Sequence, residues 1–121
     1  MRKILIVDDE AEIVVILQRF LESKQYEVTT AANGTEAMEK VREEHPEVVL
    51  LDINMPGKSG LEVLAEIQAL NLGIGVIMVT AQIDEMSGRF ALGNGAFDYI
   101  TKPFDFEYLE KVLWWKLQLM E

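Results

Sequence analysis

Short apolar runs rich in β-branched residues recur along the chain and end at polar residues, and this pattern most constrains the fold. The runs are Lys3–Val7 before Asp8 and Asp9, Val48–Leu51 before Asp52, and Gly75–Val79 before Thr80. Continuous apolar runs of this length predict strands that are buried on both faces, as in parallel sheets. The polar residues then mark the carboxyl ends of the strands.

Helical patterns lie between these runs. Apolar residues spaced three and four apart indicate amphipathic helices. One predicted core stripe contains Ile13, Ile16, Leu17, Phe20 and Leu21, and another contains Leu61, Leu64 and Ile67. Further predicted elements are strands at Tyr26–Ala31 and Phe97–Ile100, helices at Gly34–Glu44 and Ile83–Leu92, and a final helix at Asp105–Met120. The sequence therefore predicts five successive βα units.

Strict alternation with short connections predicts the fold class. Right-handed crossovers place helices on both faces of a parallel sheet, which gives a doubly wound α/β fold. We expect residues 1–121 to form a single domain of this class. In such sheets the site lies beyond the carboxyl ends of the strands. The candidate site residues are therefore Asp8, Asp9, Asp52, Thr80 and Lys102.

Composition narrows the chemistry of this site. The chain has no cysteine, so any metal must be held by oxygen ligands and a thiol nucleophile is excluded. A formal net charge of -10 disfavours direct binding to nucleic acid or to an anionic membrane. No run of 18 apolar residues occurs and acidic residues follow the first run at once, so we expect a cytoplasmic protein.

Carboxylates gathered at one edge of a sheet repel each other and raise each other's pKa, so they need a compensating cation. Magnesium prefers oxygen ligands and fits two or three carboxylates. At the end of a strand the adjacent Asp8 and Asp9 could both reach one ion. The alternative is that they only cap the first helix.

Over nearly its whole length the chain resembles the receiver domains of two-component response regulators. The matching segments, in order, are Ile4-Leu5-Ile6-Val7-Asp8-Asp9-Glu10, Leu50-Leu51-Asp52-Ile53-Asn54-Met55-Pro56-Gly57 followed by Gly60, Val79-Thr80-Ala81, and Asp98-Tyr99-Ile100-Thr101-Lys102-Pro103-Phe104. Each match alone is weak, whereas the ordered set is specific. The resemblance implies a flavodoxin-like (βα)5 domain with the strand order 2-1-3-4-5.

The resemblance also implies a chemistry. Asp52 would accept a phosphoryl group from a sensor histidine kinase or a histidine phosphotransfer protein and become a 4-aspartylphosphate. Mg2+, or Mn2+ in its place, would be held by Asp8, Asp9, Asp52 and the backbone carbonyl of Asn54. Lys102 would meet a phosphoryl oxygen, and the Lys102–Pro103 bond would be cis. An ionised carboxylate needs no general base, so alignment and charge neutralisation suffice for self-catalysed transfer and autodephosphorylation.

Other residues are expected to read or limit the phosphorylated state. By resemblance, Thr80 moves toward the phosphorylated aspartate while Tyr99 rotates inward, and the two form the switch. Asn54 and Gln82 would flank the path of an attacking water and set the phosphoryl lifetime. The helix that follows Gln82 departs from the family pattern and contains Gly88, so its register stays open.

The final helix is apolar on more than one side. Leu109, Leu113 and Leu117 form one stripe, and Tyr108, Val112, Trp115 and Leu119 form another. We expect one stripe to leave the core and to serve a homodimer or an output-domain contact through the fourth and fifth helices. Deeper burial, or cover by a further domain, is the alternative. Val14 and Val15 could similarly help to dock a kinase.

Three rival functions fit parts of the sequence. A haloacid-dehalogenase-like phosphohydrolase also uses an aspartate nucleophile, but it needs a second acid where Asn54 stands. A flavodoxin-like FMN binder would have its phosphate repelled by Asp8 and Asp9. An unphosphorylated receiver-like interaction module is disfavoured by the intact set of five side chains.

Overall fold

The computed structural model describes residues 2–81, 85–103 and 105–120, with the side chains of 85–88 left out of that description. The predicted lifetime residue Gln82 and the first two residues of the predicted helix Ile83–Leu92 lie outside the described residues. The elements, in chain order, are β1 (Lys3–Val7), α1 (Ala11–Ser23), β2 (Glu27–Ala31), α2 (Gly34–Glu44), β3 (Val48–Leu51), α3 (Gly60–Ala69), β4 (Gly75–Thr80), α4 (Glu85–Gly93), β5 (Asp98–Thr101) and α5 (Phe106–Leu119).

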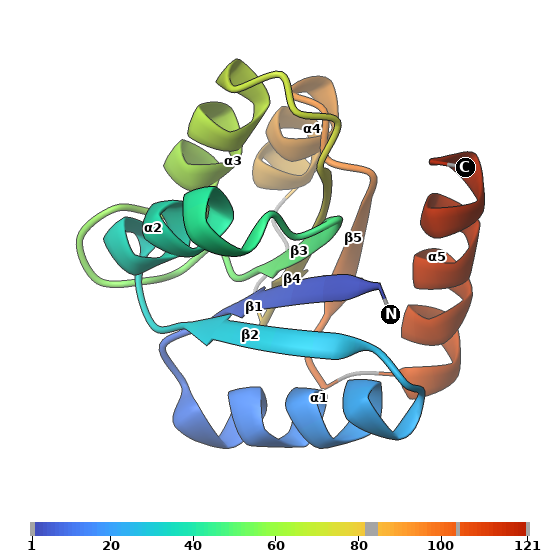
Figure 1. Cartoon of the computed structure of the whole chain (residues 1–121). Helices are drawn as coiled ribbons and strands as arrows, with labels where there is room; N and C mark the ends of the chain where they lie inside the picture. The colour runs from blue at the N-terminus through green and yellow to red at the C-terminus, as the bar shows by residue number, and fades with distance from the viewer. Residues whose placement is uncertain (1, 82–84, 104, 121) are drawn as a thin grey trace.

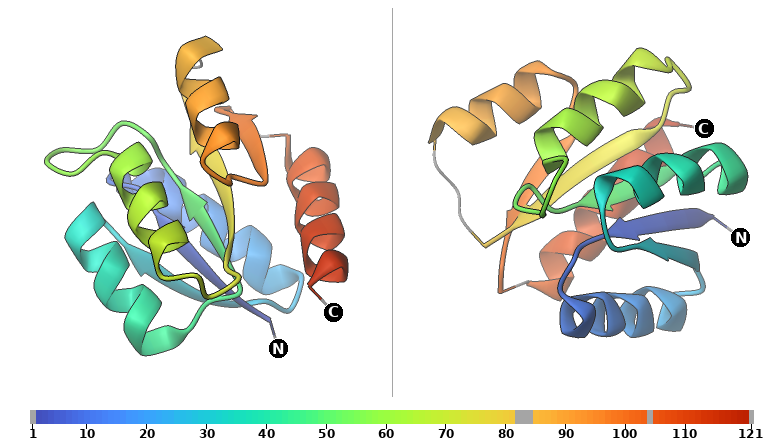
Figure 2. Two further views of the ribbon diagram at one scale, coloured as in Figure 1. Left: turned by 90° about the horizontal axis from the view of Figure 1, so that it is seen from above. Right: turned by 90° about the vertical axis from the view of Figure 1, so that its left-hand side faces the viewer.

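The described strands form one parallel sheet in the order β2-β1-β3-β4-β5. Helices α1 and α5 cover one face, and α2, α3 and α4 cover the other (Figures 1 and 2). The predicted doubly wound fold and its strand order are confirmed. Among the helices described, none has the length and apolar character that crossing a membrane requires.

Strand residues alternate between two hydrophobic cores. On β1, Leu5 and Val7 pack with α2, α3 and α4, while Ile4 and Ile6 pack with α1 and α5. The alternation follows from the two-residue period of a strand. It also explains why both faces of the central strands are apolar in sequence.

The strand register brings the predicted site residues together. Val7 of β1 pairs with Leu51 of β3, so Asp8 and Asp52 leave adjacent strands at the same edge. The backbone N–H of Asp52 donates to the Val7 carbonyl at 3.0 Å, which extends the pairing by one residue. Both acids are therefore held by main-chain bonds where the strands end.

Helices α3 and α5 begin at residues that cap them. Ser59 and Glu62 form a capping box at the start of α3, and Asp105 accepts hydrogen bonds from the backbone at the start of α5. Asp105 and Met120, the predicted ends of the last helix, are its N-cap and C-cap residues. The predicted helix was thus one residue too long at each end.

The predicted core face of α1 was wrong at Ile16. Leu17 and Leu21 are buried, but Ile16 is 48% exposed. Val14, which we expected on the outer face, is partly buried against the core beside α5. Successive helical residues lie about 100° apart, so Ile16 turns away from the sheet when Leu17 faces it. Of the two valines proposed for kinase docking, only Val15 is exposed.

The two stripes of α5 separate largely as predicted. Leu109, Leu113 and Leu117 are buried against the sheet. Val112 is also fully buried, so its assignment to the outer stripe was wrong, because it lies next to Leu113 on the side that faces the sheet. The exposed apolar residues of this helix are Tyr108, Trp114, Trp115 and Leu119.

Candidate functional site

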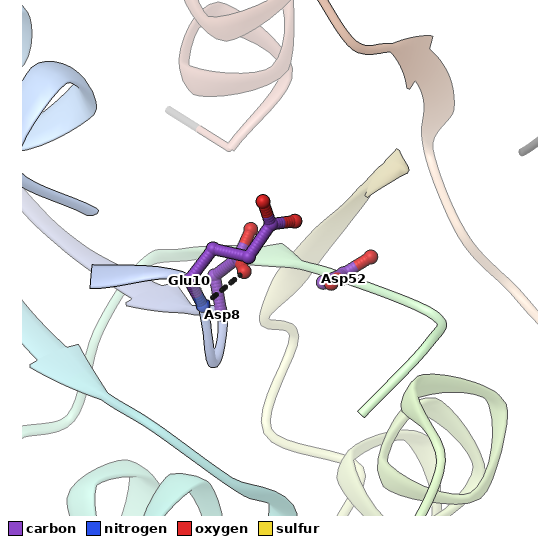
Figure 3. A group of neighbouring side chains, drawn as sticks. All are labelled: Asp8, Glu10 and Asp52. Carbon is purple, nitrogen blue, oxygen red and sulfur yellow. Dashed lines mark hydrogen bonds between the residues drawn. The ribbon is translucent and has the colours of Figure 1, made fainter. Parts of the chain in front are cut away.

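Carboxylates meet at the carboxyl end of the sheet (Figure 3). Asp8 and Asp52 are buried, at 3% and 4% exposure, whereas Glu10 is exposed. One carboxylate oxygen from each of the three lies within 4.8 Å of the others. Glu10 was not predicted as a site residue, although it follows Asp8 and Asp9 directly in the motif.

Lys102 joins this cluster from the loop after β5. Its ammonium Nζ lies 2.7 Å from Asp8 Oδ2 and 3.6 Å from Asp52 Oδ2. Its backbone N–H donates to the carbonyl of Thr80 at 2.9 Å, which fixes the loop beside β4. The peptide bond between Lys102 and Pro103 is cis. Only 7% of the Lys102 side chain is exposed, so a cation lies buried among the acids.

Electrostatics set the ionisation of Asp52. Burial raises the pKa of Asp52 from its ordinary 3.8 to about 6, and the negative charge of Asp8 adds to the rise. The charge of Lys102 and the backbone N–H of Asn54 oppose the rise. Because the resulting pKa lies below neutrality, most Asp52 side chains are ionised at pH 7. Asp52 is therefore mainly a carboxylate at neutral pH.

Lys102 stays protonated for the complementary reason. Its burial lowers the pKa of the ammonium, but hydrogen bonds to Asp8 and Glu10, and the charges of Asp8 and Asp52, outweigh that effect. The net pKa of Lys102 is raised. The cluster thus contains a lysine cation beside the carboxyl groups of Asp8 and Asp52.

Asp9 and Asn54 occupy the margin of the site. Asp9 is exposed and is not part of the close group of carboxylate oxygens, although its charge contributes to the raised pKa of Asp52. The Asn54 side chain is exposed, and its backbone N–H donates to Asp52 Oδ1 at 3.4 Å. Asp9 therefore influences Asp52 through its charge, and Asn54 contacts Asp52 through its backbone.

Thr80 and Tyr99 share one face of the sheet. Thr80 is fully buried at the end of β4, and its partner across the strands is Thr101. Tyr99 lies two residues before Thr101 and packs partly buried against the core that contains α2, α3 and α4. Because side chains two apart on a strand point to the same face, the two switch candidates are diagonal neighbours.

The donor set fits a divalent metal. Among the described residues, Asp8, Glu10 and Asp52 form a group of hard oxygen ligands that could hold an ion. Magnesium is bound through one or two carboxylates together with waters and phosphate oxygens. The excess negative charge of the cluster over its single Lys102 cation also favours a divalent ion.

Comparison with known proteins agrees with this geometry. Residues 4–113 match the response regulator receiver domain family. The alkaline phosphatase synthesis transcriptional regulatory protein PhoP of Bacillus subtilis (strain 168) is 42% identical over 103 residues, which cover 85% of this chain. The match covers only 43% of that relative, so this chain spans less than half of its length.

Solved structures resemble the whole domain. A CheY-like response regulator receiver domain protein from Methanospirillum hungatei JF-1 is 34% identical, with a TM-score of 0.91 over 98% of this chain and 95% of that one. A two-component response regulator from Clostridium difficile is 27% identical, with a TM-score of 0.94 over 100% of this chain and 99% of that one. The chain therefore belongs to the receiver domain family of two-component response regulators.

Proposed function

We propose that Asp52 accepts a phosphoryl group from a sensor histidine kinase or a histidine phosphotransfer protein and that the phosphorylated domain acts as a signalling switch. One observation carries this proposal. Asp52 directly follows the central strand β3 and is buried, and its Oδ2 lies 3.6 Å from the ammonium of Lys102, which also contacts Asp8. This arrangement supports a carboxylate nucleophile with a positive charge nearby.

The residues of the chain divide the chemistry between them. The ionised Asp52 oxygen attacks phosphorus, and the leaving group departs from the opposite side. Lys102 is close enough to donate a hydrogen bond to a phosphoryl oxygen attached to Asp52. As the family resemblance implies, we assign a magnesium ion, or manganese in its place, to Asp8, Asp9, Asp52 and the Asn54 carbonyl, although Glu10 and not Asp9 belongs to the close group of carboxylate oxygens. When bound, that ion supplies further neutralisation of the phosphoryl charge.

The same site would also remove the phosphoryl group by self-catalysed hydrolysis. Asn54 follows Asp52 by two residues, and its side chain is exposed. We assign it, together with Gln82, to control of the approach of water to the aspartylphosphate. Gln82 enters this proposal from its sequence position alone.

We assign the switch to Thr80 and Tyr99. A phosphoryl group adds about two negative charges and three strong acceptors, so it favours the conformer that brings hydroxyl and ammonium donors closest. Thr80 ends the strand next to that of Asp52, and Tyr99 shares its sheet face. A movement of Thr80 toward the phosphoryl group would open space for Tyr99 and alter the surface of α4, β5 and α5.

The surface of α4 and α5 supports a partner role. On α4, Phe90 is 49% exposed, and on α5 Trp115 and Leu119 are 51% and 72% exposed. We propose that this surface forms a homodimer or contacts an output domain. The acidic chain itself would not bind nucleic acid or membranes. We further propose that residues 1–121 act as a single receiver domain in the cytoplasm.

Intact mass spectrometry tests the proposed function. The chain is incubated with magnesium and either acetyl phosphate or phosphoramidate, with and without a chelator. We expect a single added phosphoryl group in the parent, none in Asp52→Asn, and none after chelation. An unmodified parent, or equal labelling of the Asp52→Asn variant, contradicts the proposal. Sustained turnover of phosphate esters would instead favour the phosphohydrolase alternative.

A further inference from the structure

Lys102 is shared among three carboxylates, and Asp52 is the most distant of them. The ammonium Nζ lies 2.7 Å from Asp8 and 2.9 Å from Glu10, but 3.6 Å from Asp52. Distances of 2.7 to 2.9 Å are typical of charge-assisted hydrogen bonds, whereas 3.6 Å is too long for one. The cation is therefore bonded to the two acids that follow β1 and not to the proposed acceptor.

Glu10 reaches the cluster from the protein surface. Its side chain is 57% exposed, yet its Oε1 contacts an ammonium whose side chain is only 7% exposed. Its backbone N–H donates to Asp8 Oδ1 at 2.9 Å, which fixes where the side chain starts (Figure 3). Glu10 is the N-cap residue of α1, but its side chain makes no capping hydrogen bond. The carboxylate is thus committed to Lys102 instead of to the helix.

The two short contacts of Lys102 differ in how easily they break. Asp8 is buried, with only 3% of its surface exposed, so losing its cation would leave an unpaired buried charge. Glu10 can return to solvent, where exposed ion pairs contribute little. When a phosphoryl group on Asp52 draws the ammonium toward itself, Glu10 is the partner that releases it.

We propose that Glu10 is a positioning residue that holds Lys102 back from Asp52 in the unphosphorylated domain and so limits the rate of phosphorylation. This inference rests on the proposed function of Asp52. It assigns to Glu10 a role that differs from metal binding, since a metal ligand would speed the reaction and a restraint on Lys102 slows it. The two roles therefore predict opposite effects of removing the Glu10 charge.

The test compares Glu10→Gln with Glu12→Gln. Glu12 is exposed in the first turn of the same helix, so its replacement removes the same charge from the same region. Phosphorylation by acetyl phosphate is followed by intact mass at saturating magnesium, and the magnesium concentration for half-maximal rate is measured in parallel. We expect Glu10→Gln to react about fivefold faster, which corresponds to a surface ion pair of about 1 kcal/mol. Glu12→Gln should react at the parent rate.

A second measurement does not depend on the covalent step. Beryllofluoride, a mimic of the phosphoryl group, is titrated into each magnesium-loaded protein by calorimetry. Glu10→Gln should bind it about fivefold more tightly than the parent or Glu12→Gln. A merely structural role of Glu10 would not raise this affinity.

Several outcomes overturn the inference. Phosphorylation of Glu10→Gln at the parent rate or more slowly contradicts the inference. If this variant also needs more magnesium for its half-maximal rate, Glu10 is a metal ligand instead. Equal acceleration by Glu12→Gln also removes the inference, because overall charge would then explain the effect. If the parent is not phosphorylated on Asp52 at all, the proposed function fails and this inference fails with it. A phosphorylated parent with no gain in Glu10→Gln rejects the role of Glu10 alone.

Discussion

Gly60 and Asp52 are in such close contact that no side chain fits between them. A Cβ atom added to Gly60 would lie 2.0 Å from the backbone oxygen of Asp52. The backbone N–H of Gly60 also donates to the carbonyl of Ile53 at 2.8 Å. The first residue of α3 therefore packs against the main chain of Asp52 and Ile53, which ties the start of this helix to the position of Asp52.

Replacing Gly60 with alanine should displace the loop that contains Asp52 and Ile53. Because the contact is with backbone, which cannot move away as a flexible side chain could, we expect a loss of about 1–3 kcal/mol in the free energy of unfolding. Phosphorylation by acetyl phosphate should slow as Asp52 shifts. Gly93→Ala, at the end of α4, is the control because a Cβ there meets nothing within 4 Å. Urea denaturation of both variants measures the difference, and equal stability would show that the loop accommodates the methyl group.

The raised pKa of Asp52 makes this residue a source of instability at neutral pH. Its pKa is about 6 in the folded protein and ordinarily 3.8, so the folded state binds more protons between these values. Stability contributed by protonated Asp52 is therefore present below about pH 4 and is lost as the pH rises through 6. A shift of this size corresponds to at most about 3 kcal/mol.

Asp52→Asn should consequently stabilise the metal-free domain at pH 7.5, by about 1–2 kcal/mol after allowance for relaxation around the charge. The gain should fade as the pH falls toward 4, because Asp52 is then neutral in the parent as well. Chemical denaturation in a chelating buffer at several pH values measures this. Added magnesium should raise the melting temperature of the parent more than that of Asp52→Asn. A pH-independent difference between the two proteins would contradict the electrostatic origin.

Lys102→Met should slow phosphorylation by about a hundredfold. The substitution keeps a long apolar stem and removes the only cation close to Asp8 and Asp52 among the described residues. Loss of one charge-stabilising donor at a reacting centre costs about 10²-fold in rate. The rate constant with acetyl phosphate at saturating magnesium provides the measurement. Lys58→Met is the control, since Lys58 pairs with Glu66 on the surface of α3.

Trp115→Ser should weaken association that depends on phosphorylation. Trp115 lines a shallow groove with Phe97, Gln118 and Leu119, beside β5. Trp114 is equally exposed but is not part of that groove. Light scattering of the beryllofluoride-loaded proteins should show a dimer in the parent and in Trp114→Ser, and a monomer in Trp115→Ser. A monomeric parent would instead favour contact of this surface with an output domain. Equal effects of the two tryptophan substitutions would argue against the groove beside β5 as the dimer interface.

Local patterns in the sequence predicted most of the fold. Each apolar run of four or five residues became a strand, since a segment that alternates between two cores must be apolar at every position. The weaker strands were each wrong by one residue: the prediction for β2 began one residue too early, at Tyr26, and β5 runs from Asp98 to Thr101 instead of from Phe97 to Ile100. Strand ends depend on hydrogen bonds with neighbours, which sequence patterns do not specify.

The choice between neighbouring residues required the tertiary structure. Ile16 and Val112 fit two helical faces equally well in sequence, and the packing against the sheet exposed the first and buried the second. The same holds for the acids after β1. The sequence indicates a cluster at Asp8 and Asp9, whereas the close group of oxygens contains Glu10 and leaves Asp9 in solvent.

The sequence by itself determined the order of the elements, the parallel sheet and the position of Asp52 at a strand end. These features follow from the spacing of apolar residues along the chain and from the preference of each residue for helix, strand or turn. Only the tertiary structure decided which charges meet. Lys102 and Glu10 are 92 residues apart, and their contact exists because β1 and the loop after β5 end at the same edge of the sheet. The reach of a side chain across that edge is set by packing in three dimensions, and no linear pattern encodes it.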